Sequence, residues 1–173
     1  MVSSRVVQPV RTRRDLLDFV KFPWRVYRGD PNWVPPLISE QVNYLDPRRG
    51  PFYRHAEVGL WMARRGREVL GTIAAFVNHH EVEFRGKREG GFGFFEVVED
   101  YLVAEQLLDA ATQWLRQRNI SLVRGPTNFT ANERPGVLIE GADCPPVMLA
   151  AHTPPYYKDF LERYGMEKDH DLY

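Results

Sequence analysis

Glu96 is the residue whose surroundings are the most unusual for its type. It lies in the run GFGFFEVV (residues 91–98), which is typical of a central strand, between two phenylalanines and two valines. A carboxyl group there is either exposed to a cleft or buried with a raised pKa, as a general base would be. The alternative for Glu96 is an ion pair with an arginine.

A polar loop is the second candidate site, because it follows a short strand and gathers donors and acceptors in a short span. Its side chains that could contact a ligand are Arg124, Asn128, Thr130, Asn132, Glu133 and Arg134. A structural loop that satisfies its own backbone is the alternative.

The histidines and the cysteine do not predict a metal site or a nucleophile. His79 and His80 are expected on a strand, where neighbours point to opposite faces and cannot chelate together, although His79, Glu81 and Glu83 could share one face. No HExxH or CxxC spacing supports a metal. Cys144 has no histidine nearby to activate it and is interpreted as structural. The remaining histidines are expected at the surface or in loops, at His55, His152 and His170.

Composition limits the class of protein. The chain has 173 residues, of which 43% are hydrophobic and 27% charged, as in a single soluble domain spanning residues 1–173. Its 23 basic and 23 acidic side chains cancel, which argues against a dedicated binder of nucleic acid or of a membrane surface. The N-terminus has no apolar signal region, so a cytoplasmic protein is expected.

The N-terminal third is expected to contain one strand and one helix before irregular chain. An apolar run at residues 6–10 predicts the strand, and Thr12 with Asp15 predicts a capping box that opens a helix ending at Pro23. Residues 24–37 are rich in aromatics, glycine and proline, which favours an irregular lid packed by its own aromatic side chains. A further loop is expected at residues 46–53.

Alternating apolar residues predict three antiparallel strands in the middle of the chain. Residues 56–63 and 69–77 form a hairpin around Gly66, and a turn at residues 86–90 leads to the strand at 91–98. The second strand is apolar almost throughout, as in a strand buried on both faces. A three-stranded meander is therefore expected at the centre of the fold.

The remaining pattern predicts two helices around a short strand. The apolar face of the longer helix is formed by Val103, Leu107, Ala110, Ala111 and Trp114, with Asn119 near its end. A short strand is expected at residues 121–124, and the last helix should run over residues 156–164 and stop at a glycine, residue 165.

This order of elements resembles the GNAT acyltransferase superfamily over nearly the whole chain. Residues 107–119 (LLDAATQWLRQRN) look like the helix after the family's cofactor loop, and residues 160–166 (FLERYGM) look like its final helix. GFFE at 93–96, RGPTN at 124–128 and PPYY at 154–157 look like a group of longer, uncharacterised bacterial GNAT-like proteins. The resemblance implies an α/β (α+β) fold with a mixed, mostly antiparallel sheet and helices on both faces. It also implies that residues 171–173 lie in a strand, and that the last strands and a second domain are missing.

The resemblance implies an acyl-CoA site between the third meander strand and the long helix. The implied cofactor contacts, mainly through the backbone, are Phe95, Val97, Val98, Val103, Ala104 and Asn128. The family's phosphate loop aligns with Glu99, Leu102 and Ala104, of which only the alanine fits, and Glu99 and Asp100 would place carboxylates near the phosphates. The family's usual general-acid tyrosine aligns with Leu161.

The implied reaction is acyl transfer from acetyl-CoA or another acyl-CoA to a small-molecule amine, without a metal. Glu96 would be the base, acting through water, and Tyr157 the acid, one helical turn before Leu161. The substrate contacts would be Arg124, Thr130, Asn132 and Glu133. No nucleic-acid or membrane partner is expected, and a homodimer through an open sheet edge is the oligomeric alternative. A catalytically silent GNAT-like domain that binds a ligand or supports a partner is the alternative function.

Overall fold

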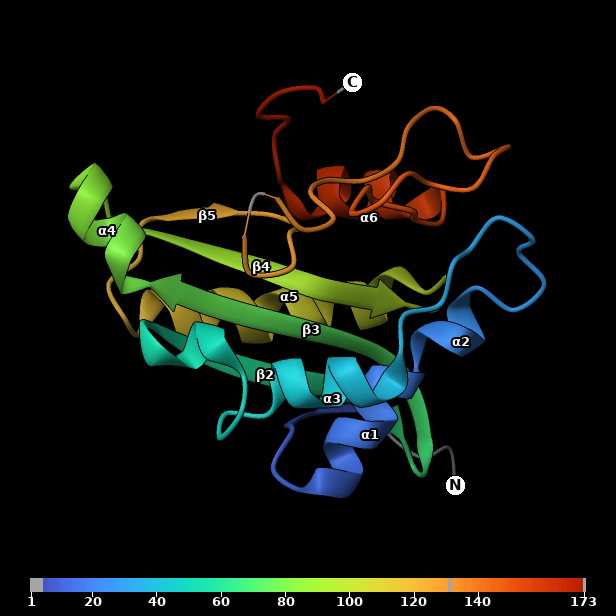
Figure 1. The fold of residues 1–173 in the computed structure, drawn as a ribbon, viewed down its shortest axis with the longest axis horizontal. Helices are drawn as coiled ribbons and strands as arrows, with labels where there is room; N and C mark the ends of the chain where they lie inside the picture. The colour runs from blue at the N-terminus through green and yellow to red at the C-terminus, as the bar shows by residue number, and fades with distance from the viewer. Residues whose placement is uncertain (1–4, 131, 173) are drawn as a thin grey trace.

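The computed structural model describes residues 5–130 and 132–172, and its centre is a five-stranded sheet in the order β1-β2-β3-β4-β5 (Figure 1). The strands are β1 (Arg5–Pro9), β2 (Ala56–Arg65), β3 (Glu68–Asn78), β4 (Glu89–Val97) and β5 (Leu122–Arg124). The first four are antiparallel to their neighbours, and β5 is parallel to β4. The predicted meander and the mixed, mostly antiparallel sheet are therefore confirmed.

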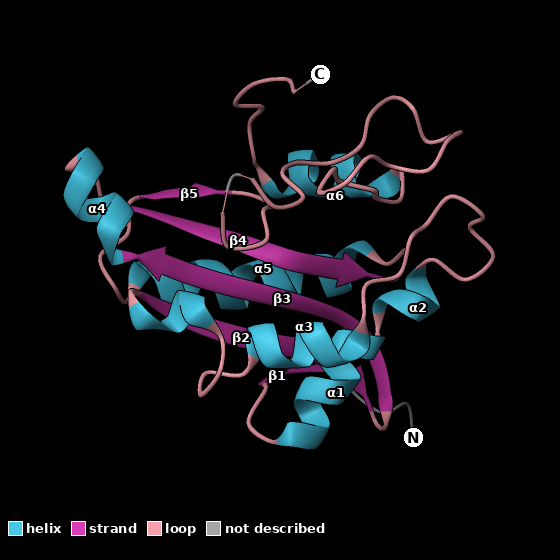
Figure 2. Cartoon of the chain, viewed as in Figure 1, coloured by secondary structure: helices cyan, strands magenta, loops and turns pink. Residues whose placement is uncertain are grey.

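Helices cover both faces of the sheet (Figure 2). They are α1 (Arg13–Lys21), α2 (Pro23–Val26), α3 (Ile38–Leu45), α4 (His79–Arg85), α5 (Tyr101–Arg116) and α6 (Tyr156–Tyr164), with a 3₁₀ turn, η1, at Pro51–Arg54. The capping box at Thr12 and Asp15 is present, and Gly165 ends α6 in the left-handed conformation.

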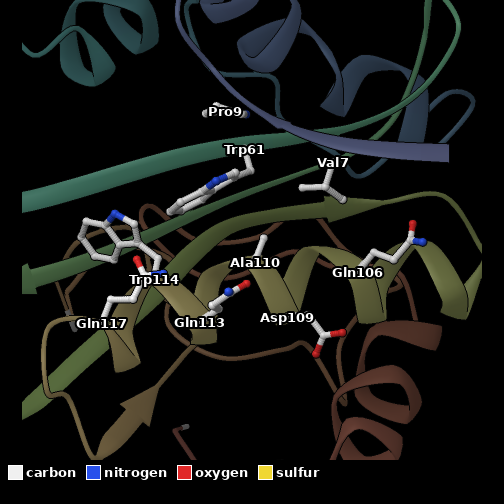
Figure 3. A pocket seen from close by; sticks show the side chains of 9 residues that line it. All are labelled: Val7, Pro9, Trp61, Gln106, Asp109, Ala110, Gln113, Trp114 and Gln117. Carbon is white, nitrogen blue, oxygen red and sulfur yellow. The ribbon is translucent and has the colours of Figure 1, made fainter.

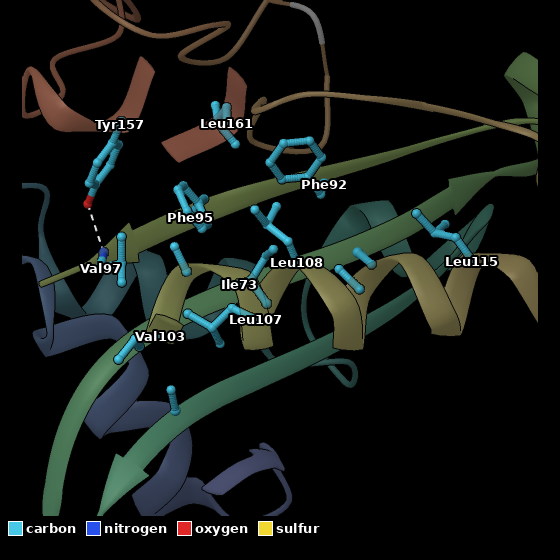
Figure 4. Packing of buried hydrophobic residues seen from close by; sticks show 14 of the residues in the cluster. Ile73, Phe92, Phe95, Val97, Val103, Leu107, Leu108, Leu115, Tyr157 and Leu161 are labelled. Atoms are coloured by element: carbon cyan, nitrogen blue, oxygen red, sulfur yellow. Dashed lines mark hydrogen bonds between the residues drawn. The ribbon is translucent and has the colours of Figure 1, made fainter. Parts of the chain in front are cut away.

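Each face of the sheet has its own hydrophobic core, because side chains alternate along the strands. On one face, Ile73 and Phe92 pack under α5 and α6 (Figure 4). On the other, Met62 and Phe76 pack under α1 and α3, together with Phe129 from the loop after β5. The two cores position β4 between them, with α6 lying over one end of that strand.

The structure corrects several predictions. His79 and His80 begin helix α4 rather than lying on a strand, because the Asn78 side chain caps the first turn and Gly86 ends it with a φ of 63°. The strand expected at the C-terminal end is absent from residues 166–172, and Tyr173 lies outside the described residues. Helix α3 was not predicted, although Ile38, Val42 and Leu45 have helical spacing.

The buried face of α5 is also displaced from the predicted one. Val103, Leu107 and Ala111 are buried as expected, but the stripe continues through residues 104, 108 and 115. Ala110 and Trp114 are only partly buried. The helix is amphipathic as predicted, with its apolar stripe rotated toward the α6 side.

Candidate functional site

The site is built on the outer edge of β4. Strand β5 pairs only with residues 89–91, so from Phe92 onward no strand lies beside this edge in the described chain. The register with β3 shifts between Thr72 and Ala74, and Phe94 at this irregularity has a φ of 46°. The bulge and the diverging strand leave the backbone of residues 92–97 to find other partners.

Groups from the loop after β5 and from helix α6 form hydrogen bonds with this backbone. The N–H of Thr127 donates to the carbonyl oxygen of Phe92 at 2.9 Å, and the N–H of Phe94 donates to Oδ1 of Asn128 at 2.9 Å. At the far end, the N–H of Val97 donates to the hydroxyl of Tyr157 at 2.8 Å (Figure 4), and the Tyr156 hydroxyl donates to the carbonyl oxygen of Val97 at 2.7 Å. Two tyrosines of α6 therefore close the edge beside Glu96.

Glu96 and Tyr157, the two predicted catalytic residues, meet directly. The Tyr157 hydroxyl donates to Oε2 of Glu96 at 2.8 Å while it accepts the N–H of Val97. Tyr157 is completely buried, and Glu96 is partly buried. Tyr157 and Leu161 share the buried face of α6, as their spacing predicts. Their roles in catalysis remain predictions.

The pKa of Glu96 is raised to about 7, chiefly because burial disfavours its charged form. The hydrogen bond from Tyr157, the nearby Tyr27 hydroxyl and the charge of Arg134 act in the opposite direction. Among the described residues no arginine lies within 4.0 Å of the Glu96 carboxyl group, although the charge of Arg134 lowers its pKa. A carboxyl group with this pKa can exchange protons near neutral pH.

Tyr27 joins the site from the lid. It is buried, stacks on Trp33 and donates its hydroxyl to the backbone oxygen of His152 at 2.9 Å. His152 lies in a loop, as the sequence predicts, but its side chain is largely buried, and its Nε2 lies 2.7 Å from Oδ2 of Asp30. This hydrogen bond lowers the pKa of Asp30. The sequence predicts that Tyr27 packs the lid, with the lining of a substrate entrance as the alternative, and nothing in its local pattern points to a carboxyl group 69 positions away.

Most predicted cofactor contacts have their side chains in the core. The side chains of Phe95 and Val97 on β4, and of Val103 and Ala104 on α5, are buried in the core between the sheet and the helices, so only their backbones could face a ligand. The N–H of Val98 donates to the backbone of β3. A cofactor contact through Val97 would have to replace the two tyrosine hydroxyls.

The N-terminus of α5 is occupied by the chain's own carboxylate. Asp100 is the N-cap and accepts the N–H of Leu102 at 3.1 Å, and Arg5 lies 2.9 Å from its other oxygen. Glu99 is exposed next to it. The Asp100 carboxylate therefore accepts a hydrogen bond from one of the N–H groups that, by the family resemblance, would bind pyrophosphate.

The predicted substrate residues do not form one cluster. Arg124 lies near Glu89 (3.9 Å) and Asp169 (3.7 Å), at the opposite end of β4 from Glu96. Glu133 accepts the Tyr44 hydroxyl at 2.8 Å over the other core.

The loop after β5 satisfies much of its own backbone, as the structural alternative predicts. The Thr127 hydroxyl donates to the Thr130 carbonyl, and the N–H of Asn128 donates to the Glu133 carbonyl. Asn132 is exposed. Two residues of this loop affect the surroundings of Glu96. The Asn128 side chain accepts the N–H of Phe94, and the charge of Arg134 lowers the pKa of Glu96.

A groove of about 490 Å³ lies elsewhere, between α5 and the first two strands (Figure 3). Trp61 and Trp114 line it together with Gln106, Gln113 and Gln117. It does not include Glu96 or Tyr157. In the described parts of the chain no three metal-ligating side chains come together, and no helix is long and apolar enough to cross a membrane.

Replacing Tyr157 with phenylalanine tests the dyad. We expect Y157F to lower the free energy of unfolding by about 1–3 kcal/mol, because the buried N–H of Val97 loses its acceptor. The pKa of Glu96 should also rise in this variant, because the Tyr157 hydrogen bond, which lowers that pKa in the parent chain, is removed. Thermal melts and a pH titration of Glu96 by NMR measure both effects. Y156F is the matched control, because it removes a hydroxyl from the same edge without touching Glu96; an equal pKa rise in Y156F would contradict the assignment.

Comparison with solved structures identifies the fold. An aminoglycoside acetyltransferase from an uncultured soil metagenomic sample superposes with a TM-score of 0.58 at 13% identity, covering 98% of this chain and 94% of the other. A predicted acetyltransferase from Clostridium acetobutylicum, solved with acetyl-CoA, gives 0.55 at 12%, covering 98% and 95%. A tandem GNAT protein from the clavulanic acid pathway gives 0.59 at 16%, covering 94% of this chain and 43% of that one. The chain has the fold of the GNAT acetyltransferases.

Two curated proteins are similar in sequence. The bacterial ceramide synthase of Caulobacter vibrioides is 38% identical over 168 residues, and protein YghO of Escherichia coli is 34% identical over 167. Each match covers 96% of this chain, which spans 44% and 43% of the two relatives. No protein-family model matches the chain.

Proposed function

We propose that this chain carries the N-acyltransferase site of an acyl-CoA-dependent enzyme, and that its acceptor is the amine of a lipid-like molecule. The observation that carries the proposal is the Glu96–Tyr157 hydrogen bond, in a GNAT fold, at the part of the β4 edge that no strand covers in the described chain. The relative from Caulobacter vibrioides is a bacterial ceramide synthase, which supports the acceptor class, because a ceramide is the amide of a fatty acid and a long-chain amino alcohol.

The dyad would move protons in a closed cycle. Ionised Glu96 accepts a proton, through water, from the substrate ammonium, and the free amine then attacks the thioester carbonyl. As the carbon–sulfur bond breaks, Tyr157 gives its proton to the leaving thiolate and recovers one from Glu96 along their hydrogen bond. The second proton of the nitrogen leaves to solvent, so both side chains return to their starting states.

The surroundings of β4 favour the thioester end of acyl-CoA, whereas those of the α5 N-terminus disfavour its phosphates. The reacting end would lie at the β4 edge, where residues 92–97 have no strand partner on that side. At the α5 end, Asp100 caps the helix, and Arg5 offsets part of its charge. This self-capped terminus favours the second candidate function, a GNAT-like domain that binds no CoA.

Thermal unfolding with acetyl-CoA, and separately with CoA, distinguishes the two functions. A bound donor at 100 times its dissociation constant stabilises the chain by roughly 2.7 kcal/mol. For a chain of this size that corresponds to a rise in melting temperature of roughly 5–10 °C. No rise with either compound at millimolar concentration would support the silent domain.

Replacing Asp100 with asparagine tests the α5 terminus. Asparagine caps a helix about as well as aspartate, so stability should change little while the negative charge disappears. We expect D100N to bind CoA several-fold more tightly in calorimetry, because a like charge at a phosphate is unfavourable. D109N, which changes an aspartate later on the same helix, is the control. Equal affinity in the parent chain and D100N would show that the phosphates do not approach Asp100.

A further inference from the structure

The exposed apolar side chains concentrate on two loops. Of the eleven large apolar residues that stand exposed in the described chain, six lie in residues 27–37 or 136–150. They are Val34, Leu37, Ile139, Val147, Met148 and Leu149. Val147 and Met148 are 78% and 91% exposed and directly follow two prolines. We call these two segments the apolar loops.

The apolar loops are joined to each other. Nδ2 of Asn32 donates to the carbonyl oxygen of Ala142 at 2.9 Å, and Asp30 binds His152 at the base of the second loop. Both loops project from the same end of the sheet, beyond the arrowhead of β4 (Figure 1). The exposed apolar groups therefore belong to one end of the molecule.

This end borders the Glu96 site. Tyr27, at the start of the first loop, hydrogen bonds to the backbone of His152 and approaches Glu96 closely enough to change its pKa. The N–H of Arg134 donates to the carbonyl oxygen of Leu149 at 2.8 Å, and the charge of Arg134 acts on the same carboxyl group. A molecule approaching Glu96 from this end would pass the apolar loops.

The charges on the loops indicate how they would bind. The apolar loops carry Arg28 and Asp30 in the first segment and Glu140 and Asp143 in the second, which makes one basic and three acidic side chains. Because acidic side chains are in excess on these loops, an anionic surface would not attract them, and binding would depend on insertion of apolar side chains. Zero net charge argues against electrostatic attachment only, since apolar insertion depends on buried apolar area.

Aromatic side chains stand behind the apolar tips. Trp33 stacks on Tyr27 and meets Trp24 edge to face at 5.2 Å. Both tryptophans are partly exposed. Partly exposed tryptophans beside apolar side chains are typical of surfaces that contact the headgroup layer of a bilayer.

We propose that the apolar loops dock the chain on the surface of an electrically neutral lipid leaflet, so that a lipid amine held in that leaflet reaches Glu96. The inference rests on the proposed function for the identity of the substrate. The occupant is a neutral leaflet because the exposed apolar groups lie on loops whose charged side chains are mostly acidic, and because these loops adjoin a site whose proposed acceptor is a lipid.

Vesicle binding tests the docking surface without relying on turnover. Flotation with phosphatidylcholine–phosphatidylethanolamine vesicles should recover the chain equally at low and high salt. The double variant V147E/M148E should bind at least about tenfold more weakly, because two inserting side chains become charged. F84E is the matched control, since Phe84 is 92% exposed on α4 and lies outside the apolar loops. Thermal melts of all three proteins confirm that each is folded.

Turnover separates failure of the docking from failure of the proposed function. With vesicles carrying a long-chain amino alcohol, V147E/M148E should lose activity about tenfold, while its activity on soluble ethanolamine stays that of the parent chain. Vesicle binding without turnover on either amine would overturn the proposed function and leave the docking standing. Absence of vesicle binding would overturn the docking, as would equal binding of the double variant. Loss of a dimer, rather than of vesicle binding, in the double variant would assign the loops to contacts between copies of the chain.

Discussion

Replacing Glu96 with glutamine should reduce acyl transfer about 10²- to 10⁴-fold, the usual contribution of a positioned acid–base group. The side chain keeps its size and can still accept the Tyr157 hydroxyl, but it can no longer take up a proton. In the parent chain, kcat/KM should rise with pH through an apparent pKa near 7, since Glu96 must be ionised to act as the base. In E96Q that rise should disappear from whatever activity remains.

The same variant should be more stable than the parent chain at alkaline pH. The pKa of Glu96 in the folded state, about 7, lies above the ordinary glutamate value of 4.5, so the folded state binds more protons between these values and stability falls as pH rises through them. Above pH 7 this ionised carboxyl group costs on the order of 1–3 kcal/mol, which E96Q should recover. Denaturant unfolding at pH 5 and pH 8 measures the difference.

E83Q is the matched control, because Glu83 is an exposed carboxylate on α4. It should leave both the rate and the pH dependence of stability unchanged. Full turnover in E96Q would show that Glu96 is not the base. The parent's pH–stability curve in E96Q would show that Glu96 does not titrate with a shifted pKa in the folded chain.

Replacing Phe129 with alanine should cost about 3–5 kcal/mol of unfolding free energy, the range for a large buried aromatic side chain. Phe129 is 1% exposed, stacks on Phe52 with ring centroids 4.5 Å apart, and meets Phe94 at 4.9 Å and Phe76 at 5.4 Å. The melting temperature should fall on the order of 10 °C. A scanning calorimeter measures both quantities.

The effect should extend to the site, because Phe129 follows Asn128, whose side chain holds the N–H of Phe94. F84A is the control, since it removes the same atoms from a side chain that is 92% exposed and should change stability by less than about 0.5 kcal/mol. A melting temperature for F129A within 2–3 °C of the parent, roughly 1 kcal/mol, would mean that the loop after β5 does not anchor the second core.

Local sequence determined most of the secondary structure. The alternation in residues 56–77, the capping box at Thr12 and the glycine at 165 act over a few neighbouring residues, so they specify strands, helix starts and helix ends without reference to distant parts of the chain. For Glu96, its apolar neighbours predicted a carboxyl group that is either exposed to a cleft or buried with a raised pKa, and the pKa is raised. The capping residues Asn78 and Gly86 carried an equally local signal for α4.

Only the tertiary structure decided which groups meet. Tyr157 lies 61 positions from Glu96, and Tyr27 lies 69 positions away on the other side. No periodicity links such residues, because the path of the chain between them is set by packing on two faces of one sheet. Phe129 shows the same limit, since a phenylalanine in a polar loop becomes a core residue only when that loop folds back over β4. The proton-exchanging group was therefore readable from local sequence, whereas its partners depend on long-range contacts that burial of the two cores creates.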